Sequence, residues 1–170
     1  MTNHVNPGLA FFRDRYSIDA NTARRLLDAA LAHGGDYAEL FFEHRTSGNI
    51  AFEQQIVKSA NRSINQGLGV RVLLGEAVGY AYTEDLSTDS MLRAADTAAK
   101  IASSGAKTPP VDILHYDTAN NYSPAASTID IPSADKVAVM RRADAAARAY
   151  DASIQRVDMV MADELKLIAI

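Results

Sequence analysis

Cysteine and tryptophan are both absent from this 170-residue sequence. The lack of cysteine excludes disulfide scaffolds, cysteine-ligated zinc sites and thiol nucleophiles within these residues. Basic residues are not in excess, because 17 lysines and arginines stand against 21 aspartates and glutamates, for a net charge of −4. Such a chain has no surplus of positive charge with which to neutralise phosphates, so we expect no nucleic-acid partner.

Long apolar runs and targeting features are also absent. No run approaches the roughly 18 residues that a membrane-spanning helix needs. Residues 1–7 have neither the basic start nor the apolar core of a secretory signal. We therefore expect a cytoplasmic protein with no membrane partner.

Alanine, in contrast, is abundant and clustered in three stretches, 20–32, 94–106 and 134–152. Alanine is the best helix former because it has no side-chain entropy to lose. The predicted N-caps of three helices are Asp19 for the first, Ser87 or Thr88 for the second and Ser133 for the third. The third helix should turn inward an apolar stripe made of Val139, Ala143, Ala146 and Tyr150, with Val137 and Met140 beside it.

Between residues 37 and 82 the apolar period changes from near 3.6 to near 2, which is typical of strands. The predicted strands cover residues 37–43, 50–59 (with a bulge), 63–74 and 77–82. Turn-forming residues predict a break at 46–49 and a type II′ hairpin at Gly75-Glu76. Two further strands, 153–161 and 164–170, are predicted around a turn at Ala162-Asp163. Short connections of this kind join antiparallel strands.

These elements predict an α+β fold, an antiparallel meander with Ala-rich helices packed on one face. We expect an N-terminal extension over 1–16, one α+β domain over 17–150, and strands over 151–170 that lead to an absent C-terminal catalytic domain. The sequence stops inside an apolar strand pattern, which favours an N-terminal piece of a longer protein. The alternative is a C-terminal strand tucked into a sheet.

The last strands would expose an apolar face if their neighbour is missing. That face is Val157, Met159 and Met161, or else Leu165, Leu167 and Ala169. An uncovered patch of this kind predicts self-association of the chain, which light scattering would detect.

The residues themselves predict no catalytic, cofactor-binding or metal residue. The Gly67–Arg71 segment lacks the third glycine of a dinucleotide fingerprint, so a strand bend or close backbone contact is the favoured interpretation. The four histidines, His4, His33, His44 and His115, have no zincin spacing. Two acid pairs, Glu84-Asp85 and Asp163-Glu164, are interpreted as turn or capping residues rather than as a general acid and base.

An ordered set of motifs nevertheless resembles a known family. The motifs are DYAELFFE at 36–43, IVKS at 56–59, QGLGVR at 66–71 and GEAVGYAY at 75–82. In this order and spacing they resemble the N-terminal domain of the TldD/PmbA family, once labelled modulators of DNA gyrase, and its TldD branch in particular.

The resemblance implies a zinc metallopeptidase that forms a heterodimer with a PmbA-like subunit and cleaves unfolded peptides. In TldD-like proteins an H-E-x-x-x-H helix and a later cysteine hold the zinc, and both belong to the C-terminal half. Neither occurs in this sequence. The resemblance therefore implies zinc in the parent protein, no cofactor in this fragment, and an inactive N-terminal domain that serves as channel wall, gate and subunit contact.

Two other functions remain open at this point. One is a stand-alone, non-enzymatic α+β interaction module. The other is a small-ligand enzyme working from the Gly67–Arg71 segment, which would have to bind a nucleotide or phosphate.

Overall fold

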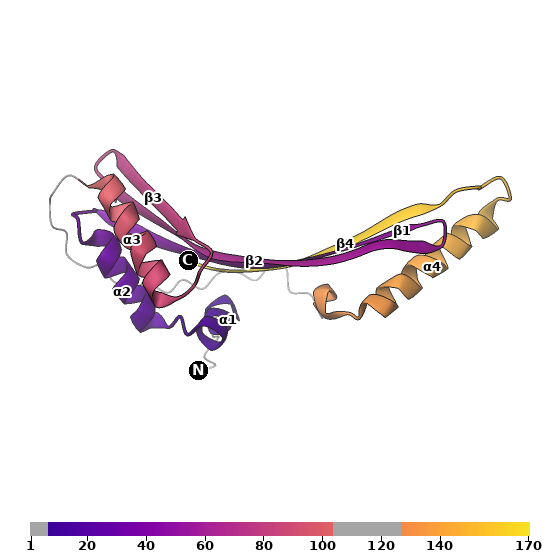
Figure 1. The fold of residues 1–170 in the computed structure, drawn as a ribbon, viewed down its shortest axis with the longest axis horizontal. Coiled ribbons are helices and arrows are strands. Elements are labelled where there is room, and N and C mark those ends of the chain that lie inside the picture. Colours follow the sequence, from indigo (N-terminus) through magenta and orange to yellow (C-terminus); the bar gives the residue numbers. More distant parts are fainter. Residues whose placement is uncertain (1–6, 104–126) are drawn as a thin grey trace, which may run out of the picture. The chain divides into compact units, whose positions relative to one another are not determined.

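The computed structural model describes residues 7–103 and 127–170, which fold into helices and one sheet (Figure 1). The elements are α1 (Pro7–Tyr16), α2 (Ala20–Leu31), β1 (Tyr37–Glu53), β2 (Ile56–Leu74), β3 (Ala77–Thr83), α3 (Thr88–Ala102), the 3-10 helix η1 (Thr128–Asp130), α4 (Ser133–Tyr150) and β4 (Asp158–Ala169). The four strands lie in the order β3-β2-β1-β4. The predicted α+β class is confirmed.

The first two strands are much longer than predicted, with 17 residues in β1 and 19 in β2. The predicted turn at 46–49 is wrong, because these residues continue β1 and Thr46 is buried. The chain turns instead at Gln54 and Gln55, whose φ angles are 49° and 65°. Two successive positive φ angles are the requirement of a type I′ hairpin turn. The predicted strand 50–59 is therefore two strands joined by that turn.

The hairpin between β2 and β3 is confirmed. Leu74 pairs with Ala77 and Leu68 with Thr83, so only Gly75 and Glu76 lie between the two antiparallel strands. Gly75 has a φ of 54°, and its N–H donates a 2.6 Å hydrogen bond to Asp36 Oδ2. Of the two turn residues, Gly75 has a positive φ and Glu76 does not, which fits the predicted type II′ turn.

The C-terminal strand, β4, is continuous. The predicted turn at Ala162-Asp163 is wrong, because both residues lie within β4. Residue numbers along β4 decrease where those along β1 increase. Glu164 forms an ion pair with Arg45, and, further along β1, Gln54 N–H donates to the carbonyl of Val157 at 3.2 Å. The two strands are therefore antiparallel.

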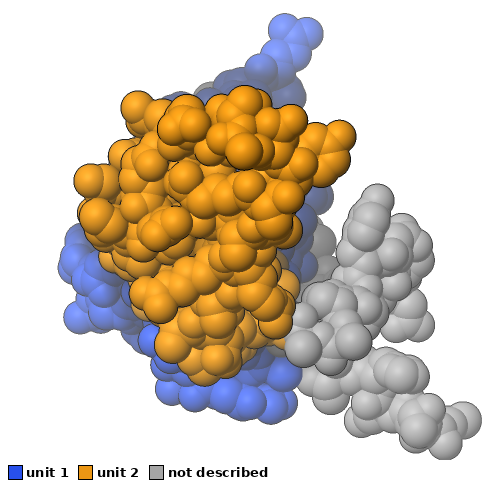
Figure 2. All heavy atoms as spheres, turned by 90° about the vertical axis from the view of Figure 1, so that its right-hand side faces the viewer, with its two compact units in different colours: residues 1–44, 65–119, 167–170 blue, residues 45–64, 120–166 orange. Residues whose placement is uncertain are grey.

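The chain divides into two compact units, coloured separately in Figure 2. Unit 1 comprises residues 1–44, 65–119 and 167–170, and unit 2 comprises residues 45–64 and 120–166. This division does not test the predicted domain boundaries at 16 and 150, which stay a prediction.

Unit 1 has its core between the helices and one face of the sheet. Leu26 and Ala30 of α2, Met91 and Ala95 of α3 and Val70 of β2 are buried there. The predicted caps hold this layer in place. Asp19 Oδ1 accepts from Thr22 N–H at 2.8 Å, and the Ser87 hydroxyl accepts from Ser90 N–H at 3.4 Å. Each cap satisfies an N–H that the first turn of a helix leaves unbonded.

Unit 2 has a smaller core, in which Ile50 and Phe52 of β1 pack against Met140 of α4. Met159 and Met161 pack against the same cluster, so this face of β4 is largely covered within the unit. Self-association of the chain stays a prediction.

The predicted inner stripe of the third helix is wrong. All four of its residues, Val139, Ala143, Ala146 and Tyr150, are exposed. Met140, which was predicted to lie beside the stripe, is buried, and so is Asp144. Ser133 is also not an N-cap. The helix begins at Ser133 itself, after Pro132 in the cap position, and no side chain caps it.

Candidate functional site

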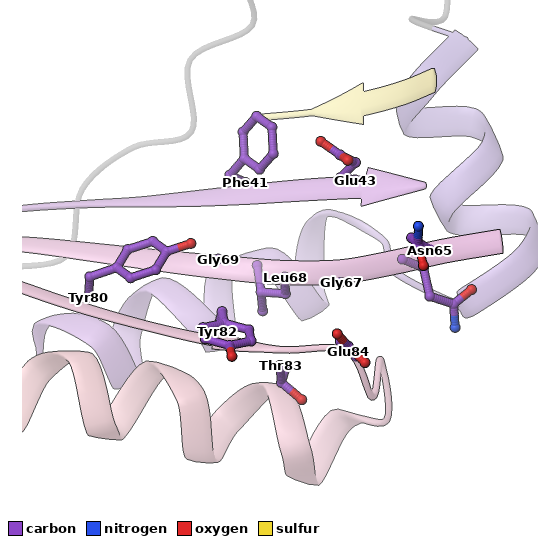
Figure 3. A pocket seen from close by; sticks show the side chains of 11 residues that line it. Phe41, Glu43, Asn65, Gly67, Leu68, Gly69, Tyr80, Tyr82, Thr83 and Glu84 are labelled. Carbon is purple, nitrogen blue, oxygen red and sulfur yellow. The ribbon is translucent and has the colours of Figure 1, made fainter. Parts of the chain in front are cut away.

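A shallow hollow of about 210 Å³ lies on the sheet face of unit 1 that the helices leave open (Figure 3). It is lined by aromatic, acidic, amide and glycine residues: Phe41, Glu43, Asn65, Gln66, Gly67, Leu68, Gly69, Tyr80, Tyr82, Thr83 and Glu84. Phe41 and Glu43 come from β1, the middle residues from β2, and the last four from β3 and the residue after it.

Strand alternation places the aromatic rings on this face. In β3, a Cβ at Gly79 would point directly into α3, so Val78, Tyr80 and Tyr82 point the other way. Tyr80 is 56% exposed and Tyr82 is 72% exposed. In β1 the same alternation buries Leu40 and Phe42 under the helices and turns Phe41 outward.

Two glycines of β2 form the floor of the hollow. A Cβ at Gly69 would lie 2.7 Å from the Tyr80 hydroxyl, and one at Gly67 would lie 2.8 Å from the Thr83 carbonyl oxygen. Figure 3 shows the Tyr80 ring reaching across towards Gly69. The predicted close backbone contact at Gly67–Arg71 is confirmed, and the segment is strand rather than a phosphate-binding loop.

Beyond Gly69, the same face carries a charge pair. Arg71 Nε lies 2.8 Å from Glu39 Oε1, and the Tyr37 hydroxyl donates to Glu39 Oε2 at 3.1 Å. Burial first, and then the hydrogen bond to the Glu39 carboxylate, raise the pKa of Tyr37. Arg71 is thus matched by a carboxylate next to the hollow.

A second polar cluster lies on the covered face of unit 1, between α1 and the sheet. His44 is 5% exposed, and its Nδ1 lies 2.9 Å from the Tyr16 hydroxyl, which donates its proton to Gln66 Oε1. With that proton engaged, the Tyr16 oxygen can accept a hydrogen bond from His44 Nδ1 in the tautomer that carries its hydrogen there. Burial, followed by the nearby Arg15 charge, lowers the pKa of His44 despite an opposing hydrogen bond with Gln66.

His33 is the other histidine among the described residues. His33, near the end of α2, has its Nε2 3.1 Å from Asp96 Oδ1 of α3. His4 and His115 lie outside the described residues. Within residues 7–103 and 127–170, no group of three or more histidine, cysteine, aspartate or glutamate side chains is arranged to hold a metal ion. The side chains present in this part of the chain therefore do not fit a zinc site.

The two acid pairs have separate structural roles. Asp85 accepts hydrogen bonds from Ser87 N–H at 2.9 Å and from the Ser90 hydroxyl at 2.7 Å, and both bonds support the start of α3. The bond from Ser90, followed by the bond from Ser87, lowers the pKa of Asp85. Asp163 forms an ion pair with Lys136 of α4. The turn or capping role is confirmed for Glu84-Asp85 and wrong for Asp163-Glu164, which lies in mid-strand.

Sequence reasoning did not find the hollow, and among its acidic and aromatic residues it weighed only Glu84 as a candidate catalytic group. A usable signal was present in the order Val78-Gly79-Tyr80-Ala81-Tyr82. Large aromatics alternate there with glycine and alanine, and small residues permit the close approach of a helix. The aromatics must then lie on the other face.

Part of the chain matches a known family of domains. Residues 38–102, which include the strands and α3 around the hollow, match the model of PmbA/TldA metallopeptidase domain 1. Over these residues the chain is similar to the first domain of PmbA/TldD proteins. The sequence-based resemblance is confirmed, and three of its four motifs fall inside the matched range, with the first beginning two residues before it.

Similarity to PmbA/TldD relatives extends over more of the chain. A metalloprotease TldD homolog of Buchnera aphidicola from Schizaphis graminum is 26% identical over 132 residues, which are 78% of this chain and 27% of the relative. A metalloprotease TldD homolog of Haemophilus influenzae is 24% identical over 143 residues, which are 83% of this chain and 30% of the relative. The chain thus spans about three tenths of the length of these curated relatives.

Two solved structures share the fold. A proposed modulator of DNA gyrase from Bacteroides thetaiotaomicron has a TM-score of 0.62 at 14% identity, over 87% of this chain and 36% of that one. TldE from Thermococcus kodakarensis has a TM-score of 0.56 at 15% identity, over 87% of this chain and 34% of that one.

Among the described residues, none of the helices has the length and hydrophobicity needed to cross a bilayer.

Proposed function

We propose that this chain is the N-terminal accessory domain of a TldD-like, zinc-dependent metallopeptidase that cleaves unfolded peptides. In this role the domain binds and guides the peptide and contacts a PmbA-like subunit, while zinc and the catalytic groups lie elsewhere in the parent protein. The family match supports the metallopeptidase assignment. The chain itself then performs no cleavage.

The observation that carries the peptide-binding role is the position of β3. β3 is an outer strand of the sheet formed by the described residues, and its exposed rings border the hollow. An outer strand presents main-chain N–H and C=O groups that an extended peptide can pair with, whatever its sequence. Unfolded chains suit such pairing, since the main-chain N–H and C=O groups along their whole length are not engaged in secondary structure.

The exposed aromatic side chains add to this pairing. Tyr80 and Tyr82 offer large amphipathic surfaces beside the β3 edge, and such rings are enriched where proteins bind peptides. Weak main-chain and aromatic contacts together suit a domain that must release its peptide to a catalytic centre.

The first experiment measures peptide binding and cleavage by the same 170-residue chain. Fluorescence anisotropy with a labelled unstructured peptide is expected to give saturable binding, and mass spectrometry after incubation with added Zn²⁺ is expected to give intact peptide. Zinc-dependent cleavage by this chain would overturn the accessory role. A chain that neither binds peptides nor co-purifies with a PmbA-like subunit would overturn the proposal as a whole.

A second experiment reads the source gene beyond codon 170. We expect the open frame to encode an H-E-x-x-x-H helix and a later cysteine. A stop codon at that point would contradict the parent peptidase and favour a stand-alone interaction module.

A further inference from the structure

We propose that the outer edge of β3 selects extended peptides in which large apolar side chains alternate with small ones. This inference rests on the proposed function and adds the class of peptide that the edge prefers. Three features of β3 carry it: the direction of its main-chain groups, the row of side chains on its open face and the helix on its other face.

Every second residue of β3 directs its main-chain groups away from the sheet. A Cβ at Gly67 of β2 would lie 2.8 Å from the carbonyl oxygen of Thr83, so the main chain of Thr83 faces β2. This direction alternates along a strand, and the main-chain groups of Val78, Tyr80 and Tyr82 therefore face outward. Among the described residues no strand lies beyond β3. An extended peptide can pair with the main chain of these three residues.

The same three residues carry their side chains on the open face of the sheet. The exposed fractions are 56% for Val78, 56% for Tyr80 and 72% for Tyr82. Residues opposite one another on neighbouring strands share a face, so the peptide residues paired with these three lie beside their side chains. Aromatic and β-branched side chains stabilise one another across strands. The peptide residues on the open face should therefore be large and apolar.

The Tyr80 ring leaves room for such a side chain. Its hydroxyl lies 2.7 Å from the place of a Cβ at Gly69, so the ring leans inward over β2 and away from the outer edge (Figure 3). A large side chain opposite Tyr80 can then pack against the outward side of the ring.

The other face of the peptide would lie next to α3. At Gly79 the space for a Cβ is taken by the carbonyl oxygen of Ala98 and the main-chain nitrogen of Ala102, so α3 rests directly on β3. A neighbouring strand lies only about 4.8 Å away, whereas a helix with its side chains is about 10 Å wide. Because α3 therefore overhangs the peptide residues on this face, those residues should be small, such as alanine or serine.

The test uses four labelled peptides that share the same lysine-containing ends and differ only in a five-residue centre. The centres are alternating isoleucine and alanine (IAIAI), the same residues in blocks (IIIAA), isoleucine throughout (IIIII) and alternating serine and alanine (SASAS). Their affinities for the 170-residue chain are measured by fluorescence anisotropy. We expect IAIAI to bind roughly five-fold more tightly than IIIAA or SASAS. IIIII should bind no better than IIIAA, because its inner isoleucines meet α3.

Variants locate the effect at the outer edge. Y82S is expected to reduce the preference for IAIAI over SASAS to about two-fold, because a cross-strand contact is lost. Y37S is the matched control, since Tyr37 is 43% exposed on the same face but lies in the inner strand β1. It should leave the preference unchanged.

A second pair of variants tests the main-chain pairing. Y80P removes an N–H that faces outward, at a position where an outer strand tolerates proline, and should abolish binding of IAIAI. Y80S keeps this N–H and should only weaken binding. Circular dichroism melting curves check that each variant is folded.

The outcomes separate this inference from the function on which it rests. Equal affinity for IAIAI and IIIAA, or an equal effect of Y82S and Y37S, would overturn the preference for alternation and leave peptide binding intact. Binding of IIIII as tight as that of IAIAI would overturn it too, because small residues would then not be needed beside α3. Absence of binding by all four peptides would overturn both the preference and the peptide-binding role.

Discussion

The carbonyl oxygen of Ala98 in α3 occupies the space that a side chain at Gly79 in β3 would need. The backbone nitrogen of Ala102 lies 2.8 Å from the same point, so the obstacle is the helix backbone, which cannot rotate away. We expect G79A to lower the free energy of unfolding by about 3 kcal/mol, because helix and strand must separate. Urea denaturation measures the change.

The neighbouring residue supplies the control for this prediction. Val78 lies on the open face of the same strand and is 56% exposed. V78A should change the free energy of unfolding by no more than about 0.5 kcal/mol. If the two variants were equally destabilised, the close packing of α3 on β3 would not be the cause.

The β1–β2 turn offers a stabilising substitution. Gln55 has a φ of 65°, a conformation that is costly for a residue with a side chain and free of that cost for glycine. Q55G is expected to raise the free energy of unfolding by roughly 0.5–1 kcal/mol. The control is Q155G, at a glutamine outside the positive-φ residues, where added chain entropy should leave stability unchanged or lower. A loss of stability in Q55G would contradict the assigned turn.

The ion pair between Lys136 and Asp163 should matter more than exposed pairs do. The Nζ–Oδ2 distance is 2.5 Å and each side chain is only 11% exposed. Because K136M leaves a largely buried carboxylate unpaired, we expect a loss of about 3 kcal/mol in the free energy of unfolding. The matched variant R156M breaks the exposed pair with Asp158 and should cost less than about 1 kcal/mol. Comparable losses in the two thermal or urea titrations would refute the distinction.

His44 should make stability depend on pH in a defined direction. Its pKa is lowered in the folded state by burial and by Arg15, so the unfolded chain binds the proton more readily. The free energy of unfolding should therefore fall as pH drops below about 6.5, the ordinary histidine value, and level off below the folded-state pKa. Urea denaturation at several pH values measures this slope. H44Q should abolish it, and an unchanged slope in that variant would assign the effect to other groups.

Sequence reasoning found what local chemistry determines and missed what distant partners determine. Asp19 and Ser87 cap their helices through N–H groups three residues away, so short segments suffice to predict them. The composition of 46–49 predicted a turn, yet Gly48 lies within β1, and the Asp163 side chain from β4 occupies the space that a Cβ at this position would need. Nothing within ten residues of Gly48 indicates that partner.

The inner face of α4 was missed for the same reason. An apolar stripe predicted Val139 and Tyr150 inside, but the helix turns Asp144 and the largely buried Lys136 towards the rest of unit 2. Those polar groups are satisfied by Arg148 at 3.1 Å and by Asp163 in β4. Charge pairing within α4 and between α4 and β4 thus overrides a weak apolar period, and the apolar periodicity of a single sequence cannot anticipate it.

The position of β4 at the end of the sequence has a consequence for how the chain folds. The β1–β2 hairpin is local, since two residues close it, whereas Arg45 and its partner Glu164 are 119 positions apart. Pairings of such long range form slowly because a large loop must be closed first. During synthesis the hairpin can therefore exist while one side of β1 still lacks its neighbour. Intermolecular strand pairing at that side is the misfolding route that this topology favours.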